Sequence, residues 1–377
     1  AIRKQILPTR DINKAVNVKI RIRLRQIASV DEKNQAIRLV VWLRFQWVNP
    51  FLTWNASEFG GIKSVHGDND LFWVPDVALF NQAGLEDEIE ILHKRISTKL
   101  IITNDGNCTW NTPITLTSQC RIDVSLFPFD KQECKLQIGS WTYSGHKVKV
   151  TSSEKNVDMV DFIRSGEWEV ESAVLSNHFT YYGPEHIPYP DITLTLKIKR
   201  RSLYYGLQII VPMTVISLLA MFNVYMSVDE GLLSNMITLV VAISVYAIII
   251  SSKLPETSDN VPVLEKYCLG ILLTVFLTSI YGPLMLMFKN ASTNKKRMNC
   301  FFSRLTKFIR RIRSVFGRRC KCRKSQNVDN ETNGSRNTET IGGDWEILGN
   351  FFRRSLQFSF WGCWVGFHAY VFIMLLL

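Results

Sequence analysis

Four long apolar stretches in the C-terminal half constrain the fold of this 377-residue chain more than any other feature. A helix needs roughly 20 apolar residues to cross the hydrocarbon core of a bilayer. Four stretches approach or exceed that length: Leu203 to Met226, Leu232 to Ile250, Val261 to Phe288 and Leu356 to Leu377. A buried globular helix could explain any one of them, but four together favour a membrane protein with four spanning helices.

The net charge of +12 comes from one segment. Residues 291 to 327 contain 13 Lys and Arg and no Asp or Glu, so the rest of the chain sums to −1. The chain is therefore a nearly neutral protein with one basic loop. We predict no nucleic-acid partner, because a nucleic-acid surface would have to rest on that loop alone.

The basic loop also predicts the orientation. Lys and Arg tend to stay on the cytoplasmic side, and the loop lies between the third and fourth stretches. Counting back through three spans places the N-terminal half outside, as in a multi-pass plasma-membrane protein. An outside location fits the glycosylation sequons at Asn55 and Asn107 and permits a disulfide among Cys108, Cys120 and Cys134.

The N-terminal half has the pattern of β-strands. Val18 to Gln26 and Ile192 to Lys199 alternate apolar with polar or charged residues, the period of strands with one buried face. Turn-like clusters, among them Asn104-Asp105-Gly106, separate further runs rich in β-branched and aromatic residues. We therefore expect an extracellular antiparallel β-sandwich at residues 1–201, membrane helices at 202–288, a cytoplasmic loop at 289–355 and a fourth membrane helix at 356–377.

Several motifs resemble one known family. Cys120 and Cys134 enclose thirteen residues, RIDVSLFPFDKQE, which look like the signature loop of the Cys-loop receptors, the pentameric ligand-gated ion channels. The likeness continues through VDEKNQ, WNASEFGGIK, WVPDVALFN, GSWTYSG, PYPDITLTL, RRSLYYGL and LPETSDNVP, and is greatest to nicotinic acetylcholine receptor subunits. The resemblance implies a Cys120–Cys134 disulfide and assembly with four further subunits, as a homopentamer or a heteropentamer. Pro128 can also fix a turn that presents the flanking phenyl rings.

In that family a ligand binds between neighbouring subunits, within a cage of aromatic rings. The matching positions are Phe80, Trp141, Tyr182 and Tyr189 on one face, and Trp47 on the opposite face with Ile101, Thr109 and Asn111 as companions. Aromatic faces attract cations, so we expect a small amine-like cationic ligand. For Trp42, Trp54 and Trp73 we expect core packing instead. The segment YGPEHIPY lacks the adjacent cysteine pair of nicotinic alpha subunits, so the identity of the ligand stays open.

The second apolar stretch has the pattern of a pore lining. One stripe down a helix contains Ser234, Thr238, Val241, Val245, Ile248 and Ser252. Hydroxyls at the inner end and apolar side chains in the middle suit an ion pathway that closes by dewetting, although helix packing could also produce such a stripe. Glu230, which precedes the stripe, would form a ring of negative charge around the pore. Lys253, which follows the stripe, carries a positive charge. We expect cation selectivity, with an anion-conducting or otherwise gated receptor as the alternative.

By the same resemblance, Arg200, Asp130, Asp31 and Pro255 form the junction between the two halves. An Arg and a carboxylate pair strongly where water is partly excluded. Arg200 and Arg201 could instead be snorkelling residues at the membrane interface.

The remaining segments predict no catalysis. We expect an amphipathic basic helix from Phe301 to Phe316, suited to the inner leaflet of the lipid bilayer. We expect disorder from Gln326 to Gly343, because this segment is polar. A further amphipathic segment should begin at Trp345 and lead into the fourth span. We find no Ser/His/Asp, metal-ligand or phosphate-loop constellation, and so expect neither an enzyme nor a cofactor. A non-conducting, membrane-tethered binding protein remains the alternative from another class.

Overall fold

The structure is a computed structural model that describes residues 6–84, 91–92, 97–182, 186–225, 230–255, 261–294, 300–316 and 333–376. It divides into two compact units. The first comprises Ala1–Leu203 with Lys253–Val261, and the second comprises Tyr204–Ser252 with Pro262–Leu377. Each unit is described by itself below.

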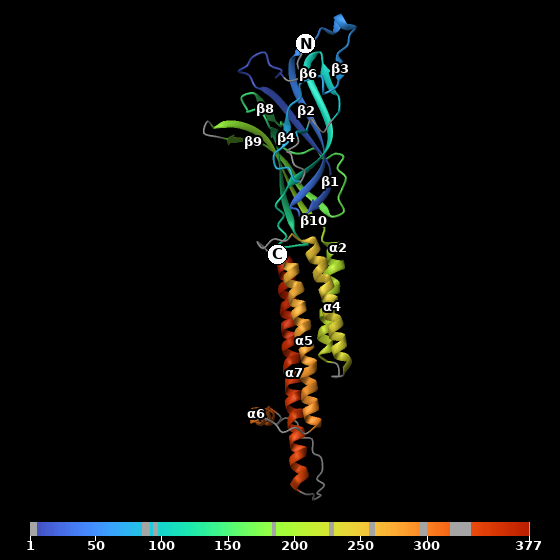
Figure 1. Cartoon of the computed structure of the whole chain (residues 1–377), viewed down its shortest axis with the longest axis vertical. Helices are drawn as coiled ribbons and strands as arrows, with labels where there is room; N and C mark the ends of the chain where they lie inside the picture. Colours follow the sequence, from blue (N-terminus) through green and yellow to red (C-terminus); the bar gives the residue numbers. More distant parts are fainter. Residues whose placement is uncertain are drawn as a thin grey trace. The chain divides into compact units, whose positions relative to one another are not determined.

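The first unit is built from ten strands and a short 3-10 helix, η1 (Ala56–Phe59). The strands are β1 (Val16–Asp31), β2 (Ala36–Thr53), β3 (Ser64–Gly67), β4 (Val77–Leu79), β5 (Leu100–Thr103), β6 (Asp105–Gln119), β7 (Lys131–Ser140), β8 (Val148–Thr151), β9 (Trp168–Tyr182) and β10 (Ile187–Arg200). They form a six-stranded sheet in the order β3-β5-β6-β2-β1-β8 and a four-stranded sheet in the order β4-β7-β10-β9 (Figure 1).

The predicted alternation is confirmed in both sheets. In β1, Val18, Ile20, Ile22 and Leu24 are buried while the charged residues between them are exposed or half-buried. In β10, the same pattern buries Ile192, Leu194, Leu196 and Ile198. Since side chains alternate across a strand, the apolar face of each sheet turns inward and the polar face remains outside. The β-sandwich predicted from the sequence is therefore confirmed.

The turn predicted at Asn104-Asp105-Gly106 joins β5 to β6. Gly106 has a φ of +85°, a conformation that residues with a side chain rarely adopt. A Cβ atom there would lie 2.6 Å from the carbonyl oxygen of Asn49. Only glycine therefore fits this turn without a backbone shift.

The second unit contains the helices. They are α2 (Leu203–Tyr205), the π-helical turn η2 (Gly206–Ile210), α3 (Val211–Asn223), α4 (Glu230–Lys253), α5 (Val263–Thr293), α6 (Cys300–Phe316) and α7 (Asn333–Leu376). Three helical segments among the described residues are long and apolar enough to cross a membrane by length and composition alone: Leu203–Asn223, Ser234–Lys253 and Val263–Thr293. They coincide with the first three predicted spans. The fourth predicted span lies within α7, and its insertion in a membrane stays a prediction.

Helix α7 lies beside α5 (Figure 1), and aromatic side chains pack the two helices together. Tyr281 of α5 meets Phe360 of α7 edge-on at 6.5 Å between ring centroids, and Phe288 stacks on Phe352 at 5.5 Å. Helix α6 joins the same end of α7 through Phe302, which lies 5.7 Å from Trp345, and through an ion pair between Arg310 and Asp344. The predicted helix between Phe301 and Phe316 is confirmed, whereas its position on a lipid surface stays a prediction.

The disorder predicted for Gln326 to Gly343 is wrong from Asn333 onward, because α7 begins at that residue. Residues 326–332 lie outside the described part of the chain. From Asn333, α7 runs without a break through Trp345 into the fourth predicted span, as expected for an amphipathic segment that leads into it.

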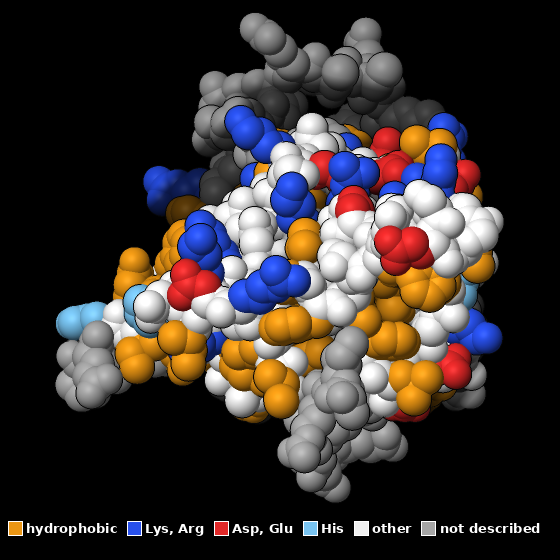
Figure 2. All heavy atoms as spheres, turned by 90° about the horizontal axis from the view of Figure 1, so that it is seen from above, with side chains coloured by type: hydrophobic (Ala, Val, Ile, Leu, Met, Phe, Trp, Pro, Cys, Tyr) orange, Lys and Arg blue, Asp and Glu red, His pale blue; other side chains and the backbone are white. Residues whose placement is uncertain are grey.

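Charged side chains of both signs share the face shown in Figure 2, where Lys and Arg lie among Asp and Glu. This mixture agrees with the near-neutral sum outside the basic loop.

Candidate functional site

An aromatic face, defined here as Phe80 and Trp141, lies on the four-stranded sheet. Phe80 directly follows β4 and Trp141 directly follows β7, two strands that pair with each other. The rings meet edge-on at 6.1 Å between centroids. Half of the Trp141 surface is exposed. The structure therefore brings these two predicted cage residues together and leaves an indole surface open to a ligand.

Asp76 holds this aromatic face in place, although sequence reasoning did not single it out. Its buried carboxylate accepts hydrogen bonds from Ser140 Oγ at 2.6 Å and from the Thr142 backbone N–H at 2.7 Å. Its carbonyl oxygen accepts one from the Trp141 N–H at 3.1 Å. Three bonds around one residue fix the backbone on both sides of Trp141. The sequence does contain a signal for this residue, because Asp76 is the last residue of the WVPD motif.

Gly139 provides the space for Phe80. A Cβ atom at Gly139 would lie 2.6 Å from Phe80 Cζ, too close for any real contact. A larger residue would displace the Phe80 ring. Gly139 therefore contributes to the site because it has no side chain.

The two predicted tyrosines lie on the β9–β10 hairpin. Tyr189 is half-buried and pairs with Thr180 across the hairpin. Tyr182 ends β9, and its side chain lies outside the described residues. Tyr181 and Phe179, which the sequence reasoning did not select, are 59% and 49% exposed. The hairpin thus presents further aromatic surface.

The prediction for Trp47 is wrong. Its side chain is only 3% exposed, and its ring packs edge-on against Trp73 at 5.8 Å. A ring inside the sandwich core cannot face a neighbouring subunit. Trp73 is itself buried, as expected, and Trp54 is half-buried with its indole N–H donating to the carbonyl of Ile62.

Trp42 lies on the same strand as Trp47 but on its outer face. It is 42% exposed, so the expectation of core packing for Trp42 is also wrong. Trp42 and Trp47 are five residues apart on β2, and an odd spacing on a strand puts two side chains on opposite faces of the sheet. The three predicted companions lie on the same outer face as Trp42. Asn111 pairs with Arg44, Thr109 with Gln46, and Ile101 with Thr109.

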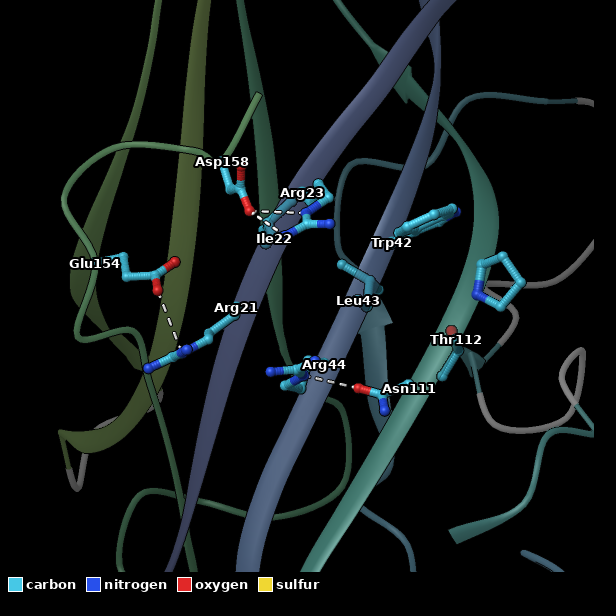
Figure 3. Close-up of a pocket in the computed structure, with 11 residues that line it drawn as sticks. Arg21, Ile22, Arg23, Trp42, Leu43, Arg44, Asn111, Thr112, Glu154 and Asp158 are labelled. Atoms are coloured by element: carbon cyan, nitrogen blue, oxygen red, sulfur yellow. Dashed lines mark hydrogen bonds and ion pairs between the residues drawn. The ribbon is translucent and has the colours of Figure 1, made fainter. Parts of the chain in front are cut away.

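This surface, called the tryptophan face below, consists of Trp42, Arg44, Ile101, Thr109 and Asn111. A pocket of about 430 Å³ lies beside Trp42 and is lined also by Arg21, Arg23, Glu154 and Asp158 (Figure 3). The guanidinium carbon of Arg25 lies 4.3 Å from the Trp42 ring centroid, and that of Arg23 lies 5.9 Å away. Arginines therefore already contact the indole.

Carboxylates from the segment after β8 pair with the β1 arginines. Arg21 pairs with Glu154 at 3.2 Å, and Arg23 pairs with Asp158 at 2.6 Å (Figure 3). The backbone N–H of Val160, together with Arg23, holds the pKa of Asp158 below its ordinary value. Asp158 therefore stays ionised at neutral pH, and its ion pair with Arg23 is lost only when acidification goes below that lowered pKa.

Arg200 is the centre of a buried cluster at one end of the sandwich. Its side chain is 0% exposed and pairs with Asp130 at 2.8 Å, Glu32 at 2.6 Å and Glu167 at 2.6 Å. Its guanidinium also stacks on Trp168 at 4.2 Å and on Phe127 at 4.8 Å. Burial alone would lower the pKa of Arg200, but hydrogen bonds and attraction from Asp130 and Glu32 outweigh it and raise that pKa.

The contacts of this cluster correct three sequence-based expectations. Asp31 does not reach Arg200, because its carboxylate accepts from the N–H and the side chain of Asn34 and so closes the β1–β2 turn. The next residue, Glu32, makes the ion pair instead. Phe127 is buried against Arg200, so Pro128 does not present both phenyl rings at the surface. Arg200 itself is a buried cluster residue and is not snorkelling.

Pro255 belongs to the sandwich unit and is half-buried. Its predicted role at the junction stays a prediction.

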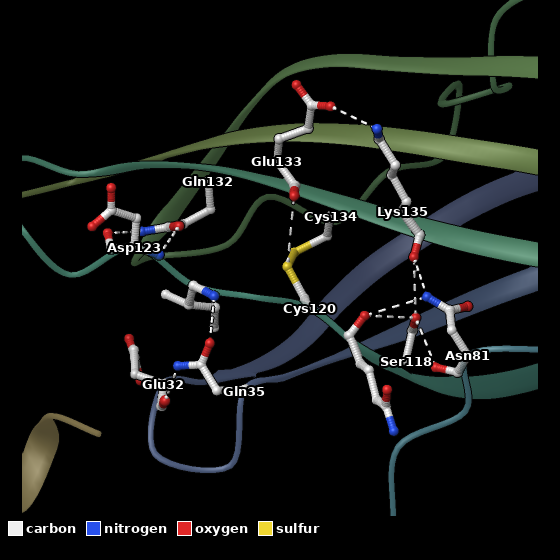
Figure 4. Close-up of a disulfide and its surroundings, with 12 residues drawn as sticks. Glu32, Gln35, Asn81, Ser118, Cys120, Asp123, Gln132, Glu133, Cys134 and Lys135 are labelled. Atoms are coloured by element: carbon white, nitrogen blue, oxygen red, sulfur yellow. Dashed lines mark hydrogen bonds and ion pairs between the residues drawn. A yellow bond between two sulfur atoms is a disulfide. The ribbon is translucent and has the colours of Figure 1, made fainter. Parts of the chain in front are cut away.

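The disulfide joins Cys120 to Cys134 (Figure 4). Around it, Gln132 Nε2 donates to the carbonyl of Asp123 at 2.8 Å, and Gln35 Oε1 accepts from the N–H of Ile122. The enclosed loop is therefore tied both to itself and to the β1–β2 turn. Cys108 is a free, buried thiol, and burial raises its pKa to about 11.

The predicted stripe on α4 is exposed within the single chain. Val241, Val245 and Ile248 are 59%, 50% and 69% exposed, and Ser234, Thr238 and Ser252 are exposed as well. Met236, Ile243 and Ile250 form the buried side of the helix, spaced seven residues apart. A helix-packing role for the stripe inside one subunit is therefore wrong. The side chain of Glu230 lies outside the described residues.

Both predicted glycosylation sites are exposed. Asn55 caps η1 by accepting from the Ser57 N–H, and Asn107 lies on β6. Exposure permits modification, which stays a prediction at each site.

Known proteins are similar to this chain in sequence. Residues 2–202 match the family model described as the neurotransmitter-gated ion-channel ligand binding domain. The human neuronal acetylcholine receptor subunit alpha-9 is 35% identical over 284 residues, which cover 75% of this chain and 57% of that relative. The alpha-9 subunit of Gallus gallus is 35% identical over 261 residues, covering 69% and 53%. Human alpha-10 is 32% identical over 269 residues, covering 71% and 58%. The chain thus spans about half the length of the curated relatives it matches.

Proposed function

Because the chain belongs to the neurotransmitter-gated ion-channel family, we propose that it is one subunit of a pentameric, plasma-membrane channel opened by a small ligand between neighbouring copies. The observation that supports this proposal is that one chain has an exposed aromatic surface on each of its two sheets. The aromatic face lies on the four-stranded sheet, and the tryptophan face lies on the six-stranded sheet. A second copy that brings its tryptophan face against the aromatic face would complete the site.

The aromatic face is proposed to bind the cationic, amine-like part of the ligand. An ammonium group over Trp141 gains roughly 0.5 to 2 kcal/mol from the ring, depending on how far water is excluded. Tyr182 and Tyr189, on the hairpin beside it, are proposed to close over the ligand. Closure would favour the open channel only if the ligand binds the open state more tightly than the closed state.

Helix α4 is proposed to line the pore. Its exposed stripe has hydroxyls at both ends and Val241, Val245 and Ile248 between them. An apolar ring built from five copies can exclude water and close the pathway, and a ring of Glu230 at the inner end would favour cations.

Recording currents from the full chain expressed alone tests the function. Trp141→Ala should raise the half-maximal concentration of any activating amine by about tenfold or more, because the exposed indole supplies the cation-binding surface. The control is Trp54→Ala, another partly exposed indole outside both faces. Unchanged sensitivity in Trp141→Ala, at equal surface expression, would remove Trp141 from the site. Surface expression without current under any ligand or pH would favour a non-conducting binding protein.

Dilution of external NaCl tests the ion selectivity. We expect the reversal potential to become more negative on dilution, following the shift of the sodium equilibrium potential, because the proposed inner ring of the pore is acidic. Glu230→Gln should reduce that movement, and Lys253→Gln at the other end of α4 serves as the control of opposite sign. A reversal potential that follows chloride would establish an anion channel instead.

A further inference from the structure

A polar groove lies on the outer face of the six-stranded sheet, at one of the two glycosylation sequons. It has a volume of about 860 Å³ and is lined by Asn107, the first residue of the sequon NCT on β6. Its other lining residues come mainly from β1, β2 and the segment around β3, and they include Lys19, Gln46 and Lys63. The structure therefore places a sugar attachment sequon beside a groove that has room for a sugar.

The strand register explains how these side chains come together. Lys19 of β1 lies opposite Gln46 of β2, and Gln46 lies opposite Thr109 of β6. Val48 lies opposite Asn107 in the next row on the same face. Residues directly opposite each other in an antiparallel ladder point to the same side of the sheet, so both rows share the outer face. A sugar attached to Asn107 therefore lies next to these side chains.

Asn107 can carry a sugar without losing its own contacts. It is exposed, its Nδ2 donates to Asp105 Oδ2, and its backbone N–H donates to Asp105 Oδ1 at 3.2 Å. In N-glycosylation the amide nitrogen bonds to C1 of a lipid-linked oligosaccharide, the lipid diphosphate leaves from C1, and the nitrogen loses one proton. The second N–H remains and can still donate to Asp105. Cys108 does not interfere, because its buried thiol lies on the opposite face of β6.

The groove offers the two kinds of contact that a sugar needs. Hydroxyl and acetamide groups need hydrogen-bond partners, and the Gln46 amide can donate and accept while the Lys63 ammonium can donate. The C–H groups of a sugar ring need an apolar contact. Val48 is 52% exposed and lies opposite Asn107, so its side chain provides such a contact at the attachment point. The groove is therefore complementary to the first sugar of an N-linked glycan.

We propose that Asn107 carries an N-linked glycan whose first N-acetylglucosamine binds in this groove, against Gln46, Lys63 and Val48. The proposal needs the sandwich unit to face the lumen of the secretory pathway, as the basic loop predicts. It needs neither a ligand nor an open channel, so it goes beyond the proposed function and is tested separately from it. Because Thr109 belongs to both the sequon and the tryptophan face, the sugar and the proposed ligand would occupy neighbouring parts of one surface.

Peptide mass spectrometry of the full chain, purified from eukaryotic cells, tests the attachment. We expect the peptide that contains Asn107 to carry a glycan. Thr109→Ser keeps the sequon and should keep the glycan, whereas Thr109→Val should lose it while Asn107 and its contact with Asp105 stay in place. Asn55→Gln removes the other sequon and should leave the glycan on Asn107 unchanged. A chain in which Asn107 carries no sugar would overturn the proposal.

A double-mutant cycle tests whether the sugar binds in the groove. Asn107→Gln should lower the unfolding temperature by roughly 2–4 °C, the shift expected when a unit of this size loses the equivalent of one hydrogen bond. Gln46→Ala should lower the unfolding temperature of the glycosylated chain, but much less in the Asn107→Gln background, where its partner is gone. Arg38→Ala is the matched control, because Arg38 is exposed on the same face of β2 and does not line the groove. Equal shifts from Gln46→Ala in both backgrounds would overturn binding in the groove.

Trimming the glycan distinguishes the first sugar from the rest. An endoglycosidase that leaves a single N-acetylglucosamine on the asparagine is applied to the Asn55→Gln chain, so that only the glycan on Asn107 is cut. We expect the trimmed chain to keep the unfolding temperature of the untrimmed chain, because the sugar in the groove is still present. A decrease as large as that caused by Asn107→Gln would assign the stabilisation to the outer sugars and reject the groove as the binding site. Currents play no part in these measurements, so a chain that does not conduct leaves the result unaffected.

Discussion

Replacing Arg200 with Gln is expected to lower the free energy of unfolding of the subunit by about 3–5 kcal/mol. The guanidinium is fully buried and forms ion pairs with three carboxylates, of which Asp130 is itself 2% exposed. Gln132 would still donate one hydrogen bond to Asp130, but the charge of that carboxylate would remain in a site from which water is excluded. The loss should appear as a lower unfolding temperature of the purified full chain and as reduced surface expression.

Two variants accompany this experiment. Arg201→Gln is the control, because Arg201 is exposed and its contact with Glu167 uses only the backbone N–H. Arg200→Lys keeps the charge but cannot reach three carboxylates with one ammonium group, so it should lie between wild type and Arg200→Gln. An unfolding temperature of Arg200→Gln equal to that of wild type would show that the cluster contributes nothing to stability.

The second large effect separates two tryptophans on the same strand. Trp47→Ala should cost about 3–5 kcal/mol of stability, because it empties a buried site that the ring shares with Trp73. Trp42→Ala should change stability by no more than about 1 kcal/mol, since it removes a half-exposed ring and its contact with Arg25. The order should reverse for ligand sensitivity, with Trp42→Ala raising the half-maximal concentration and Trp47→Ala leaving it unchanged at equal expression. A loss of sensitivity in Trp47→Ala alone would restore the first assignment.

The pleat of β2 explains why the first assignment failed. The run VWLRFQW contains two tryptophans, Trp42 and Trp47, and the family resemblance assigned Trp47 to the aromatic cage. Alternation places Trp42, Arg44 and Gln46 together, and Leu43, Phe45 and Trp47 together. The second set is entirely apolar, so the period alone could have predicted that Trp47 is buried. The predicted companions Thr109 and Asn111 lie on the outer face with Trp42, because their register partners on β2 belong to the polar set.

Other parts of the site could not be predicted from the sequence. The partners of Arg200 come from the β1–β2 turn, the disulfide loop and the segment before β9. Which of several acids in these loops reaches it depends on backbone geometry: Asp31 is used within its own turn, so Glu32 makes the contact. The role of Gly139 depends on the distance to a ring 59 residues earlier in the chain.

What the sequence determined by itself were the properties that depend on local patterns: the strands of the sandwich, the apolar helices and the basic segment. These depend on period, length and charge along the chain, and neighbouring residues are enough to define them. Only the tertiary structure decided which tryptophan is exposed, which acids surround Arg200, and which side chains border the pocket beside Trp42. Those properties depend on strand register and on loops that meet across the sandwich, because the energy of a buried or paired charge is set by groups distant in sequence.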